Sequence, residues 1–321
     1  EDFESYNQKV PRFMSEFGFQ SFPEFSSVDK YTNETDYSIY SEVMQSHQRS
    51  SIGNSTIEDY MFRYYNKPNS FAGYLYVSQI LQAYGVSMGM ESHRRNKGYS
   101  MGSLYWQLND CWPVASWSSI DYFGKWKALH YSTKKAFQPV LISFFQSDKE
   151  IELHLISDLL EPKNVDLNLK VLSFDGEILY QSNKNYLLHA DSTIKIDSLS
   201  INWLKNNFNL TSSLLVASLS SEEKEISYNN YYLSEFKDIE LTKPSIEYEI
   251  TELIDTFEIS LKSKSLVKNI FVDISSKHNF SDNYFDMIPG KEYKISIQKD
   301  ENFKLSDIKS KIKFLSLFDT Y

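Results

Sequence analysis

Apolar and polar residues alternate along the second half of the chain. The period is two in the short runs 151–156, 164–171, 193–196, 245–250, 257–261, 270–274 and 293–297. Turn residues separate the runs, as in Ser-Phe-Asp-Gly-Glu and Ile-Pro-Gly-Lys-Glu. This pattern predicts antiparallel strands that each bury one face. The runs are too many for one small sandwich. We therefore predict two, at residues 140–236 and 237–321, divided at the polar, proline-containing stretch 236–244.

The first part of the chain has a different pattern. Apolar side chains stand at helical spacing in residues 71–95, at Tyr74, Val77, Leu81, Tyr84 and Met88. The spacing predicts an amphipathic helix there, although Gly85 and Gly89 weaken its end. Residues 98–110 form an apolar run that predicts a buried strand, and residues 125–137 predict a second helix. A helix, a buried strand and a further helix favour parallel β/α units.

The size of this first region limits what it can form. A complete β/α barrel takes roughly 250 residues, which is more than residues 1–139 provide. We therefore expect the region to be the closing part of a TIM barrel whose opening strands lie outside the chain. Residues 12–16 would form one barrel strand, with Glu16 at its carboxyl end, and Trp106 would end the next strand. Barrel enzymes carry their chemistry at these strand ends, so Glu16 and Trp106 would share one rim.

Glu16 stands in an apolar stretch, among Phe13, Phe17, Phe19, Phe22 and Phe25. A carboxylate in apolar surroundings is costly unless something compensates it or uses it. Beside an indole it suits a glycosidase, because the indole stacks on a sugar ring while the carboxylate attacks the anomeric carbon. Position alone leaves competing interpretations open, namely a solvated or ion-paired glutamate and a tryptophan packed in the core.

Composition and charge narrow the class of protein. Hydrophobic residues make up 41% of the chain and aromatic residues 16%, as in a globular protein. The net charge of −10 argues against a nucleic-acid partner, which would need a basic face. No apolar run is long enough to span a membrane. The single cysteine, Cys111, excludes an intrachain disulfide and favours a cytosolic or periplasmic protein over a disulfide-stapled secreted one.

Four stretches of the sequence carry a family resemblance: residues 14–28, 101–131, 279–293 and 316–321. They resemble the C-terminal part of a β-mannosidase of glycoside hydrolase family two, and the similarity covers essentially the whole chain. The stretch 101–131 is the most specific because it matches without a gap. The resemblance implies a multidomain α/β plus all-β protein, in which the end of a catalytic TIM barrel precedes two immunoglobulin-like β-sandwiches. It also implies a retaining exo-glycosidase that removes terminal β-linked mannose from a glycan and uses no cofactor.

The resemblance also assigns roles to individual residues. Glu16, within Ser-Glu-Phe-Gly, matches the catalytic nucleophile of the family. Trp106, within Leu-Tyr-Trp-Gln-Leu-Asn-Asp, matches the aromatic floor of the mannose subsite, and the peptide bond that follows it is expected to be cis. Three further residues are expected to support the rim or line the cleft: Asn109, Asp110 and Trp112.

The acid/base glutamate of the family has no counterpart in the sequence. In the family it follows an asparagine on an earlier barrel strand, whereas only residues 1–15 precede Glu16 here. A retaining mechanism needs two carboxyl groups about 5–5.5 Å apart. We therefore expect the chain to supply the nucleophile only and to be inactive alone. The alternatives are another exo-β-glycosidase of the same family and a non-catalytic carbohydrate-binding or structural remnant.

The last predictions concern metal binding and the cellular compartment. Glu91 and His93 are two residues apart and therefore lie on different faces of the predicted helix. An ion-pair or capping role is expected for Glu91, Arg94 and Arg95. The other histidines show no ligand spacing, so we expect no metal cofactor. The expected location is periplasmic or extracellular in a bacterium and lysosomal or vacuolar in a eukaryote. The oligomeric state is not predicted.

Overall fold

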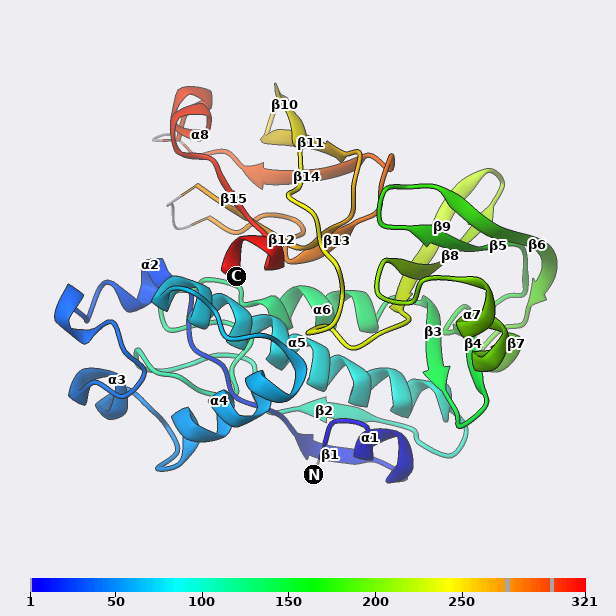
Figure 1. The fold of residues 1–321 in the computed structure, drawn as a ribbon, viewed down its shortest axis with the longest axis horizontal. Helices are drawn as coiled ribbons and strands as arrows, with labels where there is room; N and C mark the ends of the chain where they lie inside the picture. Colours follow the sequence, from blue (N-terminus) through cyan, green and yellow to red (C-terminus); the bar gives the residue numbers. More distant parts are fainter. Residues whose placement is uncertain (1, 275–277, 301–302) are drawn as a thin grey trace. The chain divides into compact units, whose positions relative to one another are not determined.

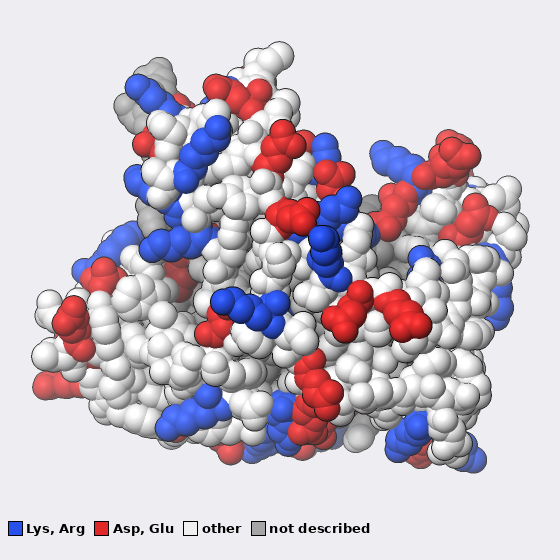
Figure 2. Space-filling view, turned by 45° about the horizontal axis from the view of Figure 1, so that its top comes forward, with Lys and Arg blue, Asp and Glu red and all other residues white. Residues whose placement is uncertain are grey.

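The computed structural model describes residues 2–274, 278–300 and 303–321 (Figure 1). The chain divides into two compact units that each draw on several segments. Unit 1 comprises Glu1–Glu16, Ser87–Leu104 and Thr133–Glu240, and unit 2 comprises Phe17–Val86, Tyr105–Ser132 and Leu241–Tyr321. On the face drawn in Figure 2, Lys and Arg side chains are interspersed with Asp and Glu.

Unit 1 contains an antiparallel β-sandwich. One sheet has the order β3-β4-β7, with β3 at Val140–Gln146, β4 at Glu150–Ser157 and β7 at Ser192–Ser200. The other has the order β6-β5-β8-β9, with the strands Ile178–Leu188, Lys163–Ser173, Ser213–Ser221 and Lys224–Tyr232. The short helices α1 (Ser5–Gln8) and α7 (Ile201–Asn207) complete the unit. The runs predicted from period two at 151–156, 164–171 and 193–196 are confirmed as β4, β5 and β7.

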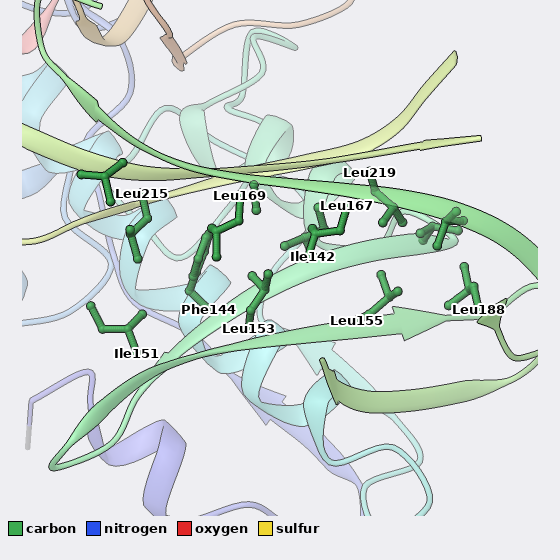
Figure 3. Packing of buried hydrophobic residues seen from close by; sticks show 14 of the residues in the cluster. Ile142, Phe144, Ile151, Leu153, Leu155, Leu167, Leu169, Leu188, Leu215 and Leu219 are labelled. Atoms are coloured by element: carbon green, nitrogen blue, oxygen red, sulfur yellow. The ribbon is translucent and has the colours of Figure 1, made fainter. Parts of the chain in front are cut away.

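The core of this sandwich comes from the alternating side chains of both sheets. Ile142, Phe144, Leu153 and Leu155 face inward from one sheet, and Leu167, Leu169, Leu215 and Leu219 face them from the other (Figure 3). The exposed fraction of each of these side chains is below a tenth. Burying a leucine or isoleucine side chain contributes about 1.5–3 kcal/mol. The alternation in the sequence is therefore the direct cause of the two-layer fold.

Unit 2 holds a second sandwich and several helices. Its sheets have the orders β10-β11-β14 (Ile246–Glu252, Thr256–Ser263, Tyr293–Gln298) and β13-β12-β15 (Phe285–Met287, Val267–Asp273, Lys313–Leu315). The strands predicted at 245–250, 257–261, 270–274 and 293–297 are confirmed. The helical elements of the unit are α2 (Phe25–Val28), η1 (Glu34–Asp36), α3 (Glu42–Ser46), α4 (Gly53–Tyr64), α8 (Leu305–Lys311) and η2 (Leu317–Thr320).

Four elements continue from one unit into the other. Helix α5 spans Phe71–Arg95, as the sequence predicts, and runs through Gly85 and Gly89 to its end. The prediction that it is amphipathic is wrong, because residues 75–83 are buried on every side of the helix. Helix α6 (Ala128–Ala136) falls within the second predicted helix. Strands β1 (Met14–Phe17) and β2 (Ser103–Tyr105) pair in a two-stranded sheet.

The prediction of a buried strand at residues 98–110 is wrong in two respects. Only Ser103–Tyr105 is strand, and Leu104 within it is 55% exposed. The reason is that β2 pairs with β1 alone among the described strands, so its apolar side chains have little to pack against. The expectation that Glu16 sits in apolar surroundings is also wrong, because Glu16 is exposed at the surface of β1.

Candidate active site

The end of β1 lies against the residue that follows β2. The main-chain N–H of Trp106 donates a hydrogen bond to the carbonyl oxygen of Phe17 at 2.7 Å. Phe17, next to Glu16 in the sequence, is buried. Gly18 follows, and a Cβ placed on it would lie 2.2 Å from the carbonyl oxygen of Trp106. Only glycine lets the two main chains approach this closely.

Trp106 has the two properties that the resemblance predicts. The peptide bond between Trp106 and Gln107 is cis. Trp106 is 48% exposed, so much of its surface is accessible to a ligand. The structure thus has an accessible aromatic platform at the first residue after β2, as required of the floor of a sugar subsite.

Asp110 has a different environment from the one expected at an open rim. It is buried, and its carboxylate accepts hydrogen bonds from the hydroxyl groups of Ser116, at 2.7 Å, and Ser118, at 2.5 Å. The side-chain amide of Gln107 donates to it at 3.2 Å. Asn109 is exposed and forms a main-chain bridge to Ile120. Asp110 therefore organises the loop from inside, and Asn109 is the polar side chain that faces solvent.

Trp112 lies on the surface of the same loop and is 37% exposed. The ring of His47 is 5.8 Å from the indole, and Nδ1 of His47 lies 2.6 Å from the carbonyl oxygen of Pro113. Tyr31 stacks on the ring of His47, with ring centres 4.2 Å apart. Burial raises the pKa of the Tyr31 hydroxyl. Trp112 thus lies beside the ring of His47 and presents a second aromatic surface.

A buried ion pair joins Lys125, in the segment that follows Trp112, to Glu24. The ammonium group of Lys125 is 3.0 Å from a carboxylate oxygen of Glu24, and both residues are buried. Burial raises the pKa of Glu24, and the charge of Lys125 opposes that rise. In the sequence, neither residue gave a sign of this pairing, because they are a hundred positions apart.

Sequence reasoning also missed a set of buried polar side chains around the loop. They are Ser21, Ser78, Gln79, Gln82, Asp121 and Lys127. The amide group of Gln82 and the ammonium group of Lys127 bind main-chain carbonyl groups of this region. No sequence signal marked them: helical spacing places Gln79 and Gln82 away from the apolar face of the predicted helix 71–95, where exposed side chains are expected.

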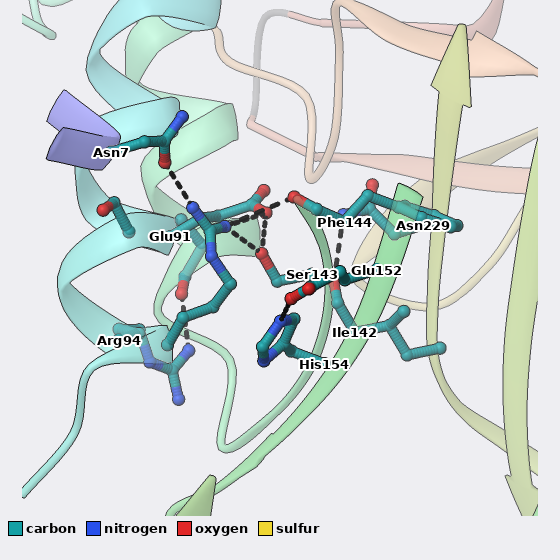
Figure 4. A network of polar contacts seen from close by, with 12 residues as sticks. Asn7, Glu91, Arg94, Ile142, Ser143, Phe144, Glu152, His154 and Asn229 are labelled. Carbon is teal, nitrogen blue, oxygen red and sulfur yellow. Dashed lines mark hydrogen bonds and ion pairs between the residues drawn. The ribbon is translucent and has the colours of Figure 1, made fainter. Parts of the chain in front are cut away.

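The ion-pair role predicted for the end of α5 is confirmed in unit 1 (Figure 4). Arg95 lies 3.9 Å from Glu91 and donates to the Ser143 hydroxyl and the Asn7 side-chain oxygen, each at 2.5 Å. Arg94 pairs with Asp158 at 2.7 Å. Burial lowers the pKa of Arg95, against the influence of Glu91.

The described ranges hold no group of three or more His, Cys, Asp or Glu side chains that could bind a metal ion. No described helix combines the length and apolar character needed to cross a bilayer.

The two sandwiches match known domain families. Residues 149–238 match the Mannosidase Ig/CBM-like domain, and residues 241–320 match an Ig-fold domain of the mannosidases. Both sandwiches are therefore immunoglobulin-like, as expected.

Comparison of the whole chain extends this result. The β-mannosidase of Capra hircus is 31% identical over 97% of the chain, and β-mannosidase A of Emericella nidulans is 28% identical over 97%. The crystal structure of a β-D-mannosidase from Dictyoglomus thermophilum superposes on 98% of the chain with a TM-score of 0.90 at 26% identity. This chain belongs to the β-mannosidase family.

The family resemblance rests on part of each β-mannosidase. The chain spans 38% of the Capra hircus protein, 37% of the Emericella nidulans protein and 38% of the Dictyoglomus thermophilum chain. An exo-chitosanase from Amycolatopsis orientalis shares the fold, with a TM-score of 0.76 over 95% of this chain at 17% identity. The named β-mannosidases are glycosidases.

Proposed function

We propose that the chain is part of a retaining β-mannosidase that hydrolyses terminal, non-reducing β-D-mannose residues. Its residues 1–139 would be the closing part of a TIM barrel, followed by sandwiches at 140–236 and 237–321. The observation that carries the proposal is the bond from Trp106 N–H to Phe17 O. Through this bond, the residue after Glu16 is joined to the main chain of Trp106, an exposed residue that is followed by a cis peptide bond.

Glu16 is the proposed nucleophile. Its carboxylate attacks C1 of the mannose while a carboxylic acid protonates the leaving oxygen, which gives a mannosyl ester and a free alcohol. Water, deprotonated by the same second group, then attacks C1 and releases mannose with its configuration retained. The second carboxyl group would come from protein outside this chain. The exposed position of Glu16 on β1 supports the assignment, since a nucleophile has to reach the sugar.

Trp106 is the proposed floor of the mannose subsite. The C–H face of a pyranose stacks on an indole, and nearly half of this indole is accessible. Asn109 supplies an exposed amide on the same loop, and Trp112 supplies a second aromatic surface. Asp110 contributes by holding the loop rather than by touching the sugar.

The test uses the intact protein that contains this chain and the isolated 321-residue chain. The intact protein should hydrolyse p-nitrophenyl β-mannoside faster than the β-galactoside or the β-glucosaminide, and NMR should detect β-mannose as the anomer released first. Glu16→Gln should lower kcat by at least about 10³-fold. Glu177→Gln, an exposed glutamate between β5 and β6, is the matched control and should leave kcat unchanged.

The outcomes separate the alternatives. Faster turnover of another β-glycoside would favour a different exo-glycosidase, and release of α-mannose first would contradict the double displacement. Hydrolysis by the isolated chain, lost on Glu16→Gln, would contradict the need for a second carboxyl group from outside. An intact protein that binds mannosides without turnover would indicate a binding module.

A further inference from the structure

Two segments meet beside the candidate site. The first is residues 18–22, here called the β1 extension, and the second is residues 106–127, here called the β2 loop. They pair through Ser21 and Ser116, whose main-chain N–H and carbonyl groups exchange hydrogen bonds of 3.0 and 3.2 Å. A pair of residues joined by two main-chain bonds is a short connection, so its stability depends on what surrounds it.

Gln82 of α5 binds both segments at once. Its side-chain oxygen accepts a hydrogen bond from the Ser21 hydroxyl at 2.6 Å. Its side-chain nitrogen donates to the carbonyl oxygen of Phe19 at 2.7 Å and to that of Ser118 at 3.4 Å. The exposed fraction of Gln82 is 0%, so these bonds form away from water. Losing one partner there would leave buried polar groups unsatisfied.

Lys127 also binds both segments. It is 1% exposed, and its ammonium group donates to the carbonyl oxygens of Ser21, at 3.2 Å, and Ser116, at 3.4 Å. Burial lowers the pKa of Lys127 to about 8, while the negative charges of Asp110 and Asp121 act in the opposite direction. Burying a charged group costs free energy unless hydrogen bonds or an opposite charge compensate for the lost water. A lysine at this position is therefore not explained by packing alone.

We propose that Gln82 and Lys127 are positioning residues for the mannosidase reaction. They fix the β1 extension against the β2 loop, and in this way they set where the Trp106 platform lies relative to the strand end that carries Glu16. Both act through the main chain of residues 19–21 and 116–118. The inference rests on the proposed function, because it assigns these contacts a role in that reaction.

The first test measures kinetics in the intact protein. Gln82→Met and Lys127→Met keep the side-chain length and remove the hydrogen bonds. A misplacement of about 1 Å at reacting groups can lower the rate about 10²-fold, so kcat should fall roughly 10- to 100-fold. KM should rise as well, because a displaced Trp106 platform is a weaker floor for the bound mannose.

Asn283→Leu is the matched control. Asn283 is 4% exposed, and its amide group binds both the N–H and the carbonyl oxygen of Val272 inside the C-terminal sandwich. This substitution removes the same chemistry at the same depth, away from both segments. It should lower the melting temperature as Gln82→Met does, and it should leave kcat unchanged.

The second test does not depend on activity. Deuterium uptake at the amides of residues 17–22 and 113–119 should rise in Gln82→Met and Lys127→Met, and should stay at the parent level in Asn283→Leu. Ser21→Ala removes one bond to Gln82 and serves if the other variants do not fold. It should raise uptake at the same amides and lower kcat by a smaller factor.

The results distinguish the two levels of the proposal. A parent protein without β-mannosidase turnover would overturn the proposed function. The uptake measurement would still report whether Gln82 and Lys127 hold the β1 extension against the β2 loop. An active parent whose Gln82, Lys127 and Ser21 variants keep both kcat and uptake would overturn the positioning role. A loss of kcat equal to that of Asn283→Leu would also overturn it, because the effect would then be general destabilisation.

Discussion

Replacing Gly18 by alanine perturbs the junction between β1 and the β2 loop without changing any charge or hydrogen-bonding side chain. The added Cβ would lie 2.2 Å from the carbonyl oxygen of Trp106 and 3.3 Å from Cδ1 of Trp117. A carbon and a carbonyl oxygen in contact are normally about 3.3 Å apart, so the main chains have to separate by about 1 Å. Overpacking of this kind costs about 1–3 kcal/mol. A displacement of about 1 Å at the Trp106 platform should also lower kcat about 10²-fold.

The assay compares Gly18→Ala with Gly98→Ala in the intact protein. Gly98 has a φ of 94°, and open space surrounds a Cβ placed on it. Alanine there strains the backbone without a clash, at a cost of about 1 kcal/mol. Both substitutions should lower the melting temperature, and only Gly18→Ala should lower kcat for p-nitrophenyl β-mannoside. Wild-type kcat and melting temperature in Gly18→Ala would refute the close approach of the two segments.

Three further predictions concern stability. Because the pKa of Lys127 is about 8 in the folded protein and 10.5 when unperturbed, the unfolded chain binds more protons between these values. The free energy of unfolding, measured by urea denaturation, should therefore rise between pH 8 and 10.5. The rise should be up to about 3 kcal/mol larger in the parent protein than in Lys127→Met. An equal dependence on pH in the two proteins would contradict this. Burial lowers the pKa of His93 from 6.5 to about 4, so the free energy of unfolding should fall as the pH drops from 6.5 to 4 and should fall less in His93→Gln. Tyr321 accepts hydrogen bonds from the Asn66 N–H and from the Asn69 side chain, each at 3.2 Å. Deleting Tyr321 should therefore destabilise the protein by about 1–3 kcal/mol. An unchanged urea midpoint would show that these contacts contribute nothing.

Alternation of apolar and polar residues predicted the strands that bury one face, and it missed strands of other kinds. β3, with Val140, Leu141, Ile142, Ser143 and Phe144 all buried, has no period of two to detect. β6 lies at the edge of its sheet with mostly exposed side chains, and residues 181–185 in its middle are polar without alternation. The pattern reports which faces meet water, and it identifies a strand only where the two faces differ.

In the candidate site, the sequence predicted some features and missed others, for a related reason. The cis peptide after Trp106 followed from a long matching stretch. The burial of Asp110 did not, since its partners Ser116 and Ser118 are ordinary loop residues in the sequence. Gln82 lies outside the predicted apolar face of its helix, so periodicity predicts an exposed side chain, whereas the structure buries it. A buried polar side chain is specified by its partners, and no periodicity encodes them.

The most direct test of the proposed chemistry is to trap the covalent intermediate. The intact protein is incubated with a 2-deoxy-2-fluoro-β-mannosyl fluoride, digested, and examined by mass spectrometry for a labelled peptide. One fluoromannosyl group attached to Glu16, with loss of activity in step with labelling, is the predicted result. A label on another residue, or an active protein that takes up the reagent at no carboxylate, would contradict the assignment of Glu16 as the nucleophile.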